Sequence, residues 1–291
     1  MPLLLLLAVV ANGMLVLSAG AQVTVTDDLR RAVTLPRTPE RIVSLAPSIT
    51  ETLFAIGAGN QVAGVTDYCN YPEEARKKPR VGGMINPSIE TIVSLRPDLI
   101  ILSVEGNLRD DFQTLTRLGT AVFVTNPRTL EGIHKSIADL GMLTGRMEES
   151  ARVLWSMQSL ERAVLAPMKM RIERSALLIV SLHPLIVAGS GTFLAEILAL
   201  AGGRNLAASS PSAYPQFSRE AVVDGDPEVL FVLSDAGGGS QSLTDLYPEW
   251  RRVRAVRNGR VYYVDADILS RPGPRAASGL ELVARLLNAK P

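Results

Sequence analysis

Residues 145–174 read GRMEESARVLWSMQSLERAVLAPMKMRIER and separate two parts of the chain that have comparable length. Apolar residues recur there at intervals of three and four positions, at Met147, Ala151, Leu154, Met157, Leu160, Val164 and Met168. This spacing places one apolar stripe along a helix whose other sides are charged. About 20 helical residues would extend about 30 Å, the width of a small domain. We therefore predict a long helix over residues 146–174 that joins two lobes, with an ordinary helix of one large domain as the alternative.

Pro167 limits this helix. A proline removes one helical hydrogen bond, and its ring clashes with the carbonyl group four residues earlier, here that of Ala163. We therefore expect the helix to end near Ala166 or to kink there, so that residues 168–174 lead into the second lobe.

Short apolar runs alternate with helical patterns before this segment. Strands are expected at residues 42–45, 62–65, 98–103 and 121–125, and helices at residues 48–56, 89–95, 109–118 and 130–144. Ser48 or Thr50 can cap the first of these helices. Alternating strands and helices with continuously apolar strands predict an α/β lobe whose mainly parallel sheet is covered on both faces. Ligands bind outside the carboxyl ends of such strands, which makes the loops at residues 46–48, 67–71 and 103–107 candidates for a ligand face.

The residues after the predicted helix repeat this outline. Strands are expected at residues 176–182, 185–187, 228–233 and 260–264, with a helix up to Leu200 and a last amphipathic helix at residues 280–287. The segment SIETIVSLRPD at residues 88–98 aligns without gaps with SREAVVDGDPE at residues 218–228. We therefore predict two similar α/β lobes, residues 22–145 and 175–291, joined by a linking helix at residues 146–174.

The composition excludes several kinds of site. A formal net charge of +1 gives no reason to expect nucleic acid or an acidic membrane as a partner. The single cysteine, Cys69, allows neither an internal disulfide nor a cysteine-built metal site. Two histidines, His134 and His183, are too few for a histidine-rich zinc or manganese site. The chain contains no nucleophile-elbow or zinc-protease motif, so we predict no catalytic residue, no metal site and no resident cofactor.

Residues 1–21 are apolar and end in small residues. Ala19-Gly20-Ala21 fits a cleavage site before Gln22, which predicts a secretory signal peptide and an exported protein. No Lys or Arg precedes the apolar run, and the run is nearly long enough to remain as an uncleaved anchor.

Five segments in order carry a family resemblance. They are RIVSLAPSITETLFAIGAG from Arg41, VAGVTDYCNYPEEARKKPRVGG from Val62, SIETIVSLRPDLII from Ser88, AYPQFSREAVV from Ala213 and SRPGPR from Ser270. With these segments the chain resembles the iron-siderophore/vitamin B12 class of periplasmic binding proteins, nearest the cobalamin-binding branch. The resemblance implies two α/β lobes joined by one long helix, a class III periplasmic binding protein, with a ligand in the cleft between the lobes. It also implies a periplasmic, monomeric protein that delivers a corrinoid, ferric siderophore or haem to an ABC permease with two-fold symmetry.

The candidate ligand-binding residues lie mainly in predicted loops. Tyr68 and Tyr214 offer rings with one hydroxyl group, which suit a large ligand of mixed polarity. Asp267 and Arg271 lie in the loop DADILSRPGPR, where the five donors of an arginine suit amide, phosphate or carboxylate groups. We expect Arg275 of the same loop to be structural and to pair with a carboxylate in its own lobe.

Four further residues complete the candidate set. Ser48 can contact a ligand or cap its helix, and His183 before Pro184 can face the cleft and ligate cobalt or iron, although a lone histidine is more often a hydrogen-bonded loop residue. Met84 and Ser103 stand where the cobalamin branch carries further aromatic residues, and Tyr214 stands where it commonly carries a tryptophan. These departures leave room for a different corrinoid or another ligand. The predicted ligand-binding residues are Ser48, Tyr68, Met84, His183, Tyr214, Asp267 and Arg271.

Glu90 and Glu220 occupy matching places in the internal repeat, each two residues after a serine. A carboxylate in the first turn of a helix gains about 0.3–1 kcal/mol from the helix dipole, which would explain both residues without a partner. The family resemblance implies instead that one exposed glutamate per lobe docks on arginines of the permease.

Three alternatives remain open from the sequence. The ligand can be a ferric siderophore or haem rather than a corrinoid, where a siderophore would favour more converging arginines and haem a tyrosine or histidine ligand. The chain can be an exported enzyme, for which only His183 with an unassigned carboxylate could serve. It can also bind a partner without any small ligand, in which case the lobes should pack with no open cleft. Since a single helix resists bending, we expect only small closure of the lobes.

Overall fold

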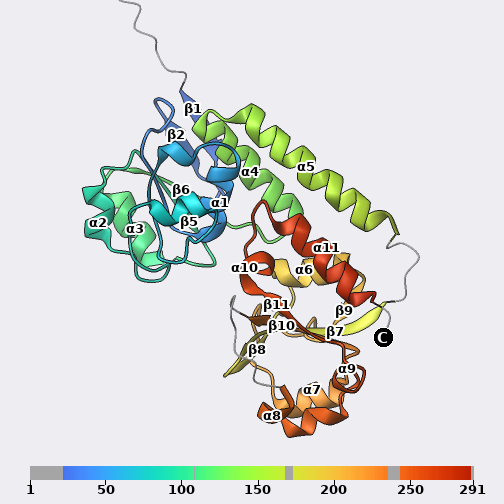
Figure 1. Cartoon of the computed structure of the whole chain (residues 1–291). Helices are drawn as coiled ribbons and strands as arrows, with labels where there is room; N and C mark the ends of the chain where they lie inside the picture. The colour runs from blue at the N-terminus through green and yellow to red at the C-terminus, as the bar shows by residue number, and fades with distance from the viewer. Residues whose placement is uncertain (1–21, 108, 168–172, 235–242, 290–291) are drawn as a thin grey trace, which may run out of the picture.

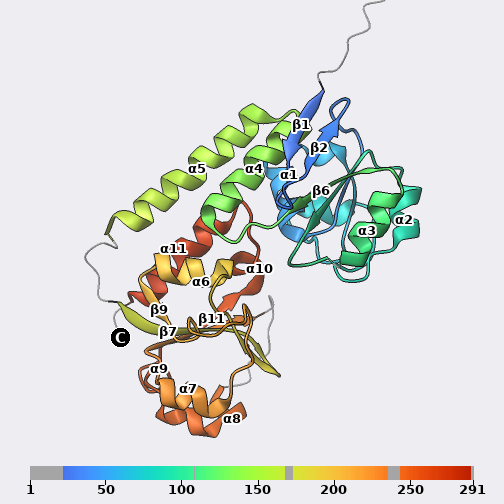
Figure 2. The same ribbon diagram turned by 180° about the vertical axis from the view of Figure 1, so that it is seen from behind.

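The computed structural model describes residues 22–107, 109–167, 173–234 and 243–289. The predicted signal peptide at residues 1–21 lies outside these ranges. Two α/β lobes follow each other in the chain, and a long helix runs beside both of them (Figures 1 and 2). Within the described ranges, every helix is too short or too polar to cross a membrane.

The first lobe contains a parallel sheet of four strands in the order β4-β3-β5-β6. The strands are β3 (Ile42–Ser44), β4 (Val62–Val65), β5 (Leu99–Ser103) and β6 (Ala121–Thr125). Its helices are α1 (Pro47–Ala55), α2 (Ile89–Ser94), α3 (Arg109–Arg117) and α4 (Leu130–Thr144), with 3-10 turns η1 (Gly59–Gln61) and η2 (Glu73–Lys77). All of the strands and helices predicted here are confirmed to within about two residues.

The second lobe repeats this strand order around a longer central strand. Its sheet runs β11-β10-β7, with β8 and β9 both pairing with β7. Among the described strands of this sheet, β7 and β8 pair antiparallel as a hairpin, and the other pairs are parallel. The strands are β7 (Arg174–Leu182), β8 (Leu185–Val187), β9 (Gly203–Asn205), β10 (Val229–Ser234) and β11 (Val261–Asp265). The helices are α6 (Phe193–Leu200), α7 (Arg219–Gly225), α8 (Leu243–Leu246), α9 (Arg254–Arg257), α10 (Ala266–Leu269) and α11 (Ala276–Leu287), with the 3-10 turn η4 (Pro248–Arg252).

The two lobes also share a burial pattern, in which one central strand of each sheet alternates its side chains between two cores. In β5, Leu99 and Ile101 join the large core beneath α1, α4 and α5, whereas Ile100 and Leu102 join a separate core beneath α2 and α3. β10 alternates in the same way, with Val229 and Phe231 in the large core and Leu230 and Val232 beneath α7 and η4. Since side chains of a strand alternate between its two faces, both sheets are covered on both faces, and the predicted fold class is confirmed.

The linking helix is α5 (Met147–Leu165), which packs on α4 of the first lobe and on α11 of the second. Its last residue precedes Pro167 by two positions, which confirms the predicted end near Ala166. The predicted extension of the helix to residue 174 is wrong, because Arg174 already begins β7. Met147, at the start of the predicted apolar stripe, is 63 % exposed, so the buried part of the stripe begins only further along α5. The predicted lobe boundaries stay predictions.

A small antiparallel hairpin precedes the parallel sheet of the first lobe and was not predicted. Its strands are β1 (Val23–Thr26) and β2 (Ala32–Leu35), which pair from Val23 with Leu35 to Thr26 with Ala32. The sequences VTVT and AVTL alternate apolar and polar residues, and this period of two is the signal that indicates the hairpin.

Candidate functional site

A cleft of about 430 Å³ opens between the two lobes. In the first lobe it is lined by loops that follow β3, β4 and β5, at the carboxyl ends of the parallel strands, as predicted. In the second lobe it is lined by Tyr214 and by α10 with the loop after it. The lining residues are Ala46, Pro47, Ser48, Tyr68, Met84, Ser103, Glu105, Gly106, Tyr214, Ala266, Asp267, Ser270, Arg271 and Pro272.

Six of the seven predicted ligand-binding residues line this one cleft, and His183 does not. The exposed His183 lies in the β7–β8 hairpin, where its ring centroid is 6.0 Å from that of Tyr247. Ser48 lies in the first turn of α1, and the predicted cap is wrong because the N-cap residue is Ala46. Met84 and Ser103 both line the cleft.

Arg271 reaches from the second lobe into the first. Its Nη1 donates to Oε1 of Glu51 at 2.9 Å and to Oδ1 of Asn70 at 2.7 Å. Its Nη2 donates to the carbonyl of Tyr68 at 3.2 Å and to Oδ1 of Asp267 at 2.5 Å. Both terminal nitrogens of this guanidinium are therefore occupied by groups of the protein.

Arg275 also pairs with the other lobe, which corrects the expectation that it meets a carboxylate of its own lobe. Its Nε donates to Oε2 of Glu51 at 2.8 Å and its Nη2 to Oε1 at 2.7 Å. Glu51 lies on α1 and is only 3 % exposed. The loop after α10 thus crosses to α1, and Nδ2 of Asn70 adds a hydrogen bond to Oδ2 of Asp267 at 2.6 Å.

Sequence reasoning missed Glu51, and within the predicted ligand-face loops it singled out neither Asn70 nor Glu105. Glu51 lies in SITETLFAIG, a helix that is otherwise apolar or uncharged and largely buried. A buried carboxylate needs cationic or hydrogen-bonding partners, so an isolated glutamate in an apolar helix is the signal that could have identified it.

Tyr214 of the second lobe and Glu105 of the first lobe both line the cleft, and they interact electrostatically. Partial burial raises the pKa of the Tyr214 phenol to about 12, and the negative charge of Glu105 adds to this while Arg128 opposes it. Burial also raises the pKa of the Glu105 carboxyl, although Arg128 lies 3.8 Å away and lowers it. The phenol of Tyr214 is therefore a neutral hydrogen-bonding group at physiological pH, whereas Tyr68 presents a ring that is 60 % exposed.

In a spectrophotometric titration, we expect one tyrosine to ionise only near pH 12 and Tyr214→Phe to remove this component. The folded-state pKa exceeds the unfolded value of about 10. The contribution of this phenol to the free energy of unfolding is thus intact below about pH 10 and is lost as the pH rises towards 12. Far-UV circular dichroism at each pH ensures that the folded protein is being titrated. If Tyr214→Phe still showed a tyrosine that ionises near pH 12, the assignment of this ionisation to Tyr214 would be wrong.

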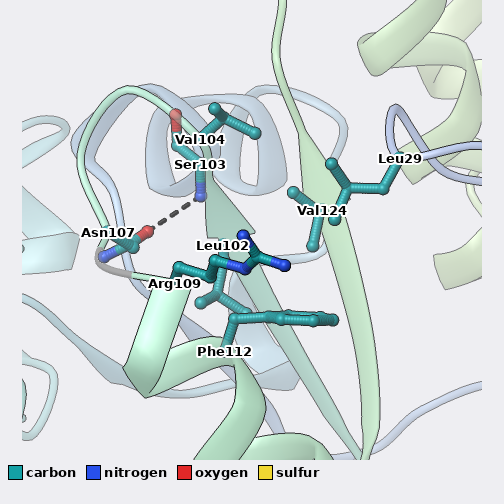
Figure 3. Close-up of a pocket in the computed structure, with 8 residues that line it drawn as sticks. All are labelled: Leu29, Leu102, Ser103, Val104, Asn107, Arg109, Phe112 and Val124. Carbon is teal, nitrogen blue, oxygen red and sulfur yellow. Dashed lines mark hydrogen bonds between the residues drawn. The ribbon is translucent and has the colours of Figure 1, made fainter.

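A second cavity of about 460 Å³ lies beside the cleft and belongs to the first lobe alone (Figure 3). It is lined by Leu29, Leu102, Ser103, Val104, Asn107, Arg109, Phe112 and Val124. Asn107 holds the loop between the two cavities: its Oδ1 accepts from Ser103 N at 2.8 Å, and its Nδ2 donates to the carbonyl groups of Leu45 at 3.1 Å and Met84 at 2.7 Å. These bonds fix the first-lobe wall of the cleft.

Glu90 and Glu220 lie outside the cleft, each as the second residue of a short helix, α2 or α7. The hydroxyl of Ser88 accepts from Thr91 N at 3.2 Å, and that of Ser218 accepts from Ala221 N at 3.0 Å. The pKa of the Glu220 carboxyl is lowered by hydrogen bonds from its own backbone N–H and from Ser218. Both glutamates are exposed, and α2 and α7 cover the faces of their sheets that are turned away from α5 (Figure 1).

The described residues contain no group of three or more His, Cys, Asp or Glu side chains that could hold a metal ion. Cys69 is buried and accepts a hydrogen bond from Thr50 Oγ1 at 3.1 Å. The chemistry that the cleft offers is therefore ring contact, hydrogen bonding and charge from the chain itself.

Comparison with known proteins gives a consistent answer. The periplasmic binding protein family matches residues 42–268. An uncharacterized ABC transporter substrate-binding lipoprotein of Bacillus subtilis, YvrC, is 32 % identical over 270 residues, which cover 90 % of this chain and 84 % of the relative. The crystal structure of the periplasmic vitamin B12 binding protein BtuF of Vibrio cholerae has a TM-score of 0.79 at 30 % identity, covering 86 % of this chain and 96 % of that one.

A haem-binding protein shares the fold as well. The periplasmic heme-binding protein RhuT from Roseiflexus sp. RS-1 superimposes with a TM-score of 0.76 at 26 % identity, covering 85 % of this chain and 97 % of that one. These relatives confirm the resemblance to the vitamin B12 and iron-siderophore class that the sequence motifs indicated. The chain belongs to the periplasmic binding protein family.

Proposed function

We propose that this protein is exported, binds a corrinoid in the cleft between its lobes and delivers it to an ABC permease. The observation that carries the proposal is the convergence of six predicted ligand-binding residues from both lobes on one cleft. Its relatives support the class, since one is described as an ABC transporter substrate-binding lipoprotein and another as a vitamin B12 binding protein. The second of these relatives is described as periplasmic and the first as a lipoprotein, which supports export of this protein.

The cleft fits a corrinoid better than haem. Haem carries two carboxylates and an iron that takes an axial ligand such as histidine or tyrosine. Arg271 already has carboxylate partners, His183 lies outside the cleft lining, and the raised pKa of Tyr214 disfavours its phenolate. Cobalamin instead has a neutral, amide-rich periphery, for which Glu105, Asp267 and the hydroxyl groups of the cleft are hydrogen-bond acceptors. The haem-binding relative keeps haem as the second candidate.

The proposal is tested by calorimetric titration of the purified protein with cyanocobalamin, haemin and a set of ferric siderophores. We expect cyanocobalamin to bind at least about tenfold more tightly than haemin, a difference of about 1.4 kcal/mol. Tightest binding by haemin or by a siderophore would replace the corrinoid with that ligand. Absence of binding to cyanocobalamin and to related corrinoids would discard the proposed ligand, and conversion of a bound corrinoid into a product would reveal an enzyme.

Replacement of the cleft rings is expected to weaken binding of cyanocobalamin. Tyr68→Ala and Tyr214→Ala each remove an aromatic surface whose burial is worth about 1–2 kcal/mol, so each should raise Kd by about 5- to 30-fold. His183→Ala is the control, since His183 lies against Tyr247 outside the cleft lining, and its Kd should equal that of the wild type. An equal loss in all three variants would show that the cleft does not hold the ligand.

Delivery requires a permease surface that recognises both lobes. We propose that Glu90 and Glu220 supply this recognition, one carboxylate from each lobe. Their matching positions in the internal repeat suit a partner built from two equivalent halves, and a single copy of this chain would present both carboxylates. The protein is thus proposed to act as a monomer on a permease of two-fold symmetry.

A further inference from the structure

The charged residues that line the cleft are unequal in their freedom to meet a ligand. They are Glu105, Asp267 and Arg271, so the lining contains one cation among the residues that the structure describes. The side chain of Arg271 is 11 % exposed and forms ion pairs with Glu51 and Asp267 at 2.9 and 2.5 Å. Glu105, by contrast, has one ion-pair partner among the described residues, Arg128 at 3.8 Å. Among the described residues that line it, the cleft therefore offers a ligand the carboxylate of Glu105 but no unpaired positive charge.

The positive charge of Arg271 is compensated in part by a residue behind the cleft wall. Glu51 and Asp267 carry the two negative charges of the cluster, and Arg271 and Arg275 carry its two positive charges. The side chain of Glu51 is 2 % exposed and is absent from the cleft lining. It bonds both arginines, since Oε1 accepts from Arg271 and from Arg275. Removal of its charge would leave one uncompensated positive charge beside the ligand.

We propose that Glu51 is a specificity-determining residue that excludes anionic ligands from the cleft by neutralising Arg271 from inside the first lobe. This inference rests on the proposed function only in that the ligand occupies this cleft. Glu51 does not need to touch the ligand, because charges interact over several ångströms where water is excluded. One unit charge at about 10 Å changes the affinity for a singly charged ligand on the order of tenfold at an effective dielectric constant of about 20.

Three variants vary the charge of the cluster without changing side chains that line the cleft. Glu51→Gln makes the cluster positive by one unit, Arg275→Gln makes it negative by one unit, and the double variant is neutral again. Glu148→Gln on the exposed surface of α5 removes the same charge at a distance and is the matched control. If Glu51→Gln alone fails to fold, Arg275→Gln and the double variant still test the opposite sign and the return to neutrality.

The probes are cyanocobalamin and its monocarboxylate derivative, in which one side-chain amide is replaced by a carboxylate. We expect the ratio of their affinities to shift about tenfold towards the carboxylate in Glu51→Gln and about tenfold away from it in Arg275→Gln. The double variant and Glu148→Gln should keep the wild-type ratio. The shifts should shrink when the salt concentration is raised, which a purely steric change would not produce.

The outcomes separate this inference from the proposed function. If the wild type binds no corrinoid, the proposed ligand is wrong, and the same variants are titrated with haemin and with a neutral ferric hydroxamate as the charge pair. If a ligand binds the wild type but the ratio is the same in Glu51→Gln and Arg275→Gln, the role of Glu51 is overturned. A double variant that behaves like either single variant would also overturn it, because its cluster is neutral.

Discussion

The double variant Glu90→Ala/Glu220→Ala is expected to bind cyanocobalamin with the wild-type Kd and to support no uptake of it. Both carboxylates are exposed in the first turns of α2 and α7, and neither of them lines the cleft. Their removal costs the protein only an interaction with the dipole at the start of each helix. A charged group at an interface, once paired and desolvated, costs about 2–5 kcal/mol when its partner is truncated. Loss of two such contacts at once would remove productive docking.

Uptake is measured with radiolabelled cyanocobalamin in cells or proteoliposomes that contain the cognate permease, and Kd is measured separately by calorimetry. Glu148→Ala is the matched control, because Glu148 is an exposed glutamate in the first turn of α5 and belongs to neither repeat. It should leave uptake unchanged. Each single variant should retain partial uptake, since one lobe still docks. Normal uptake by the double variant would remove the docking role from both residues.

Most of the fold could be predicted because its strands are buried on both faces. Continuous apolar runs such as residues 99–102 define a strand of a parallel sheet, and Pro167 fixes the end of the linking helix within two residues. The β1–β2 hairpin was missed because its strands are only four residues long and half of their side chains are exposed. β9 was missed for a similar reason, since its three residues contain a glycine and two polar side chains.

The cleft was predicted better than the contacts within it. Strand ends and loops mark Ser48, Tyr68 and the loop after β11, because the carboxyl ends of parallel strands meet at one edge. Position along the chain says nothing about which charges meet across the lobes. Arg275 pairs with Glu51, which is 224 residues away in the sequence, and this pairing depends on the angle between the lobes. His183 was assigned to the cleft because it follows a strand end, but the tight turn to β8 carries it towards Tyr247.

Glu220, the proposed docking residue of the second lobe, lies on a helix that has a packed support beneath it. Trp250 of η4 is fully buried, and its ring centroid lies 4.4 Å from that of Tyr247. Its Nε1 donates to the carbonyl of Arg219 at 3.2 Å, at the first residue of α7 and next to Glu220. The guanidinium of Arg219 lies 4.8 Å from the centre of the Tyr247 ring. Trp250 therefore supports the start of α7, and loss of its side chain would displace Glu220.

Trp250→Ala is expected to lower the free energy of unfolding by about 3–5 kcal/mol, the usual cost of removing a buried aromatic side chain and leaving a cavity. Trp250→Phe should cost less, because it keeps most of the apolar surface and loses the bond to Arg219, worth about 1 kcal/mol. The other tryptophan of the chain supplies the control: Trp155 on α5 is 70 % exposed, so Trp155→Ala should change stability by less than about 0.5 kcal/mol. Urea unfolding followed by far-UV circular dichroism measures all three without relying on tryptophan emission. Because α7 rests on Trp250, the folded Trp250→Phe variant should also lose uptake more than it loses affinity for cyanocobalamin. Equal losses of stability in Trp250→Ala and Trp155→Ala would show that this support does not exist.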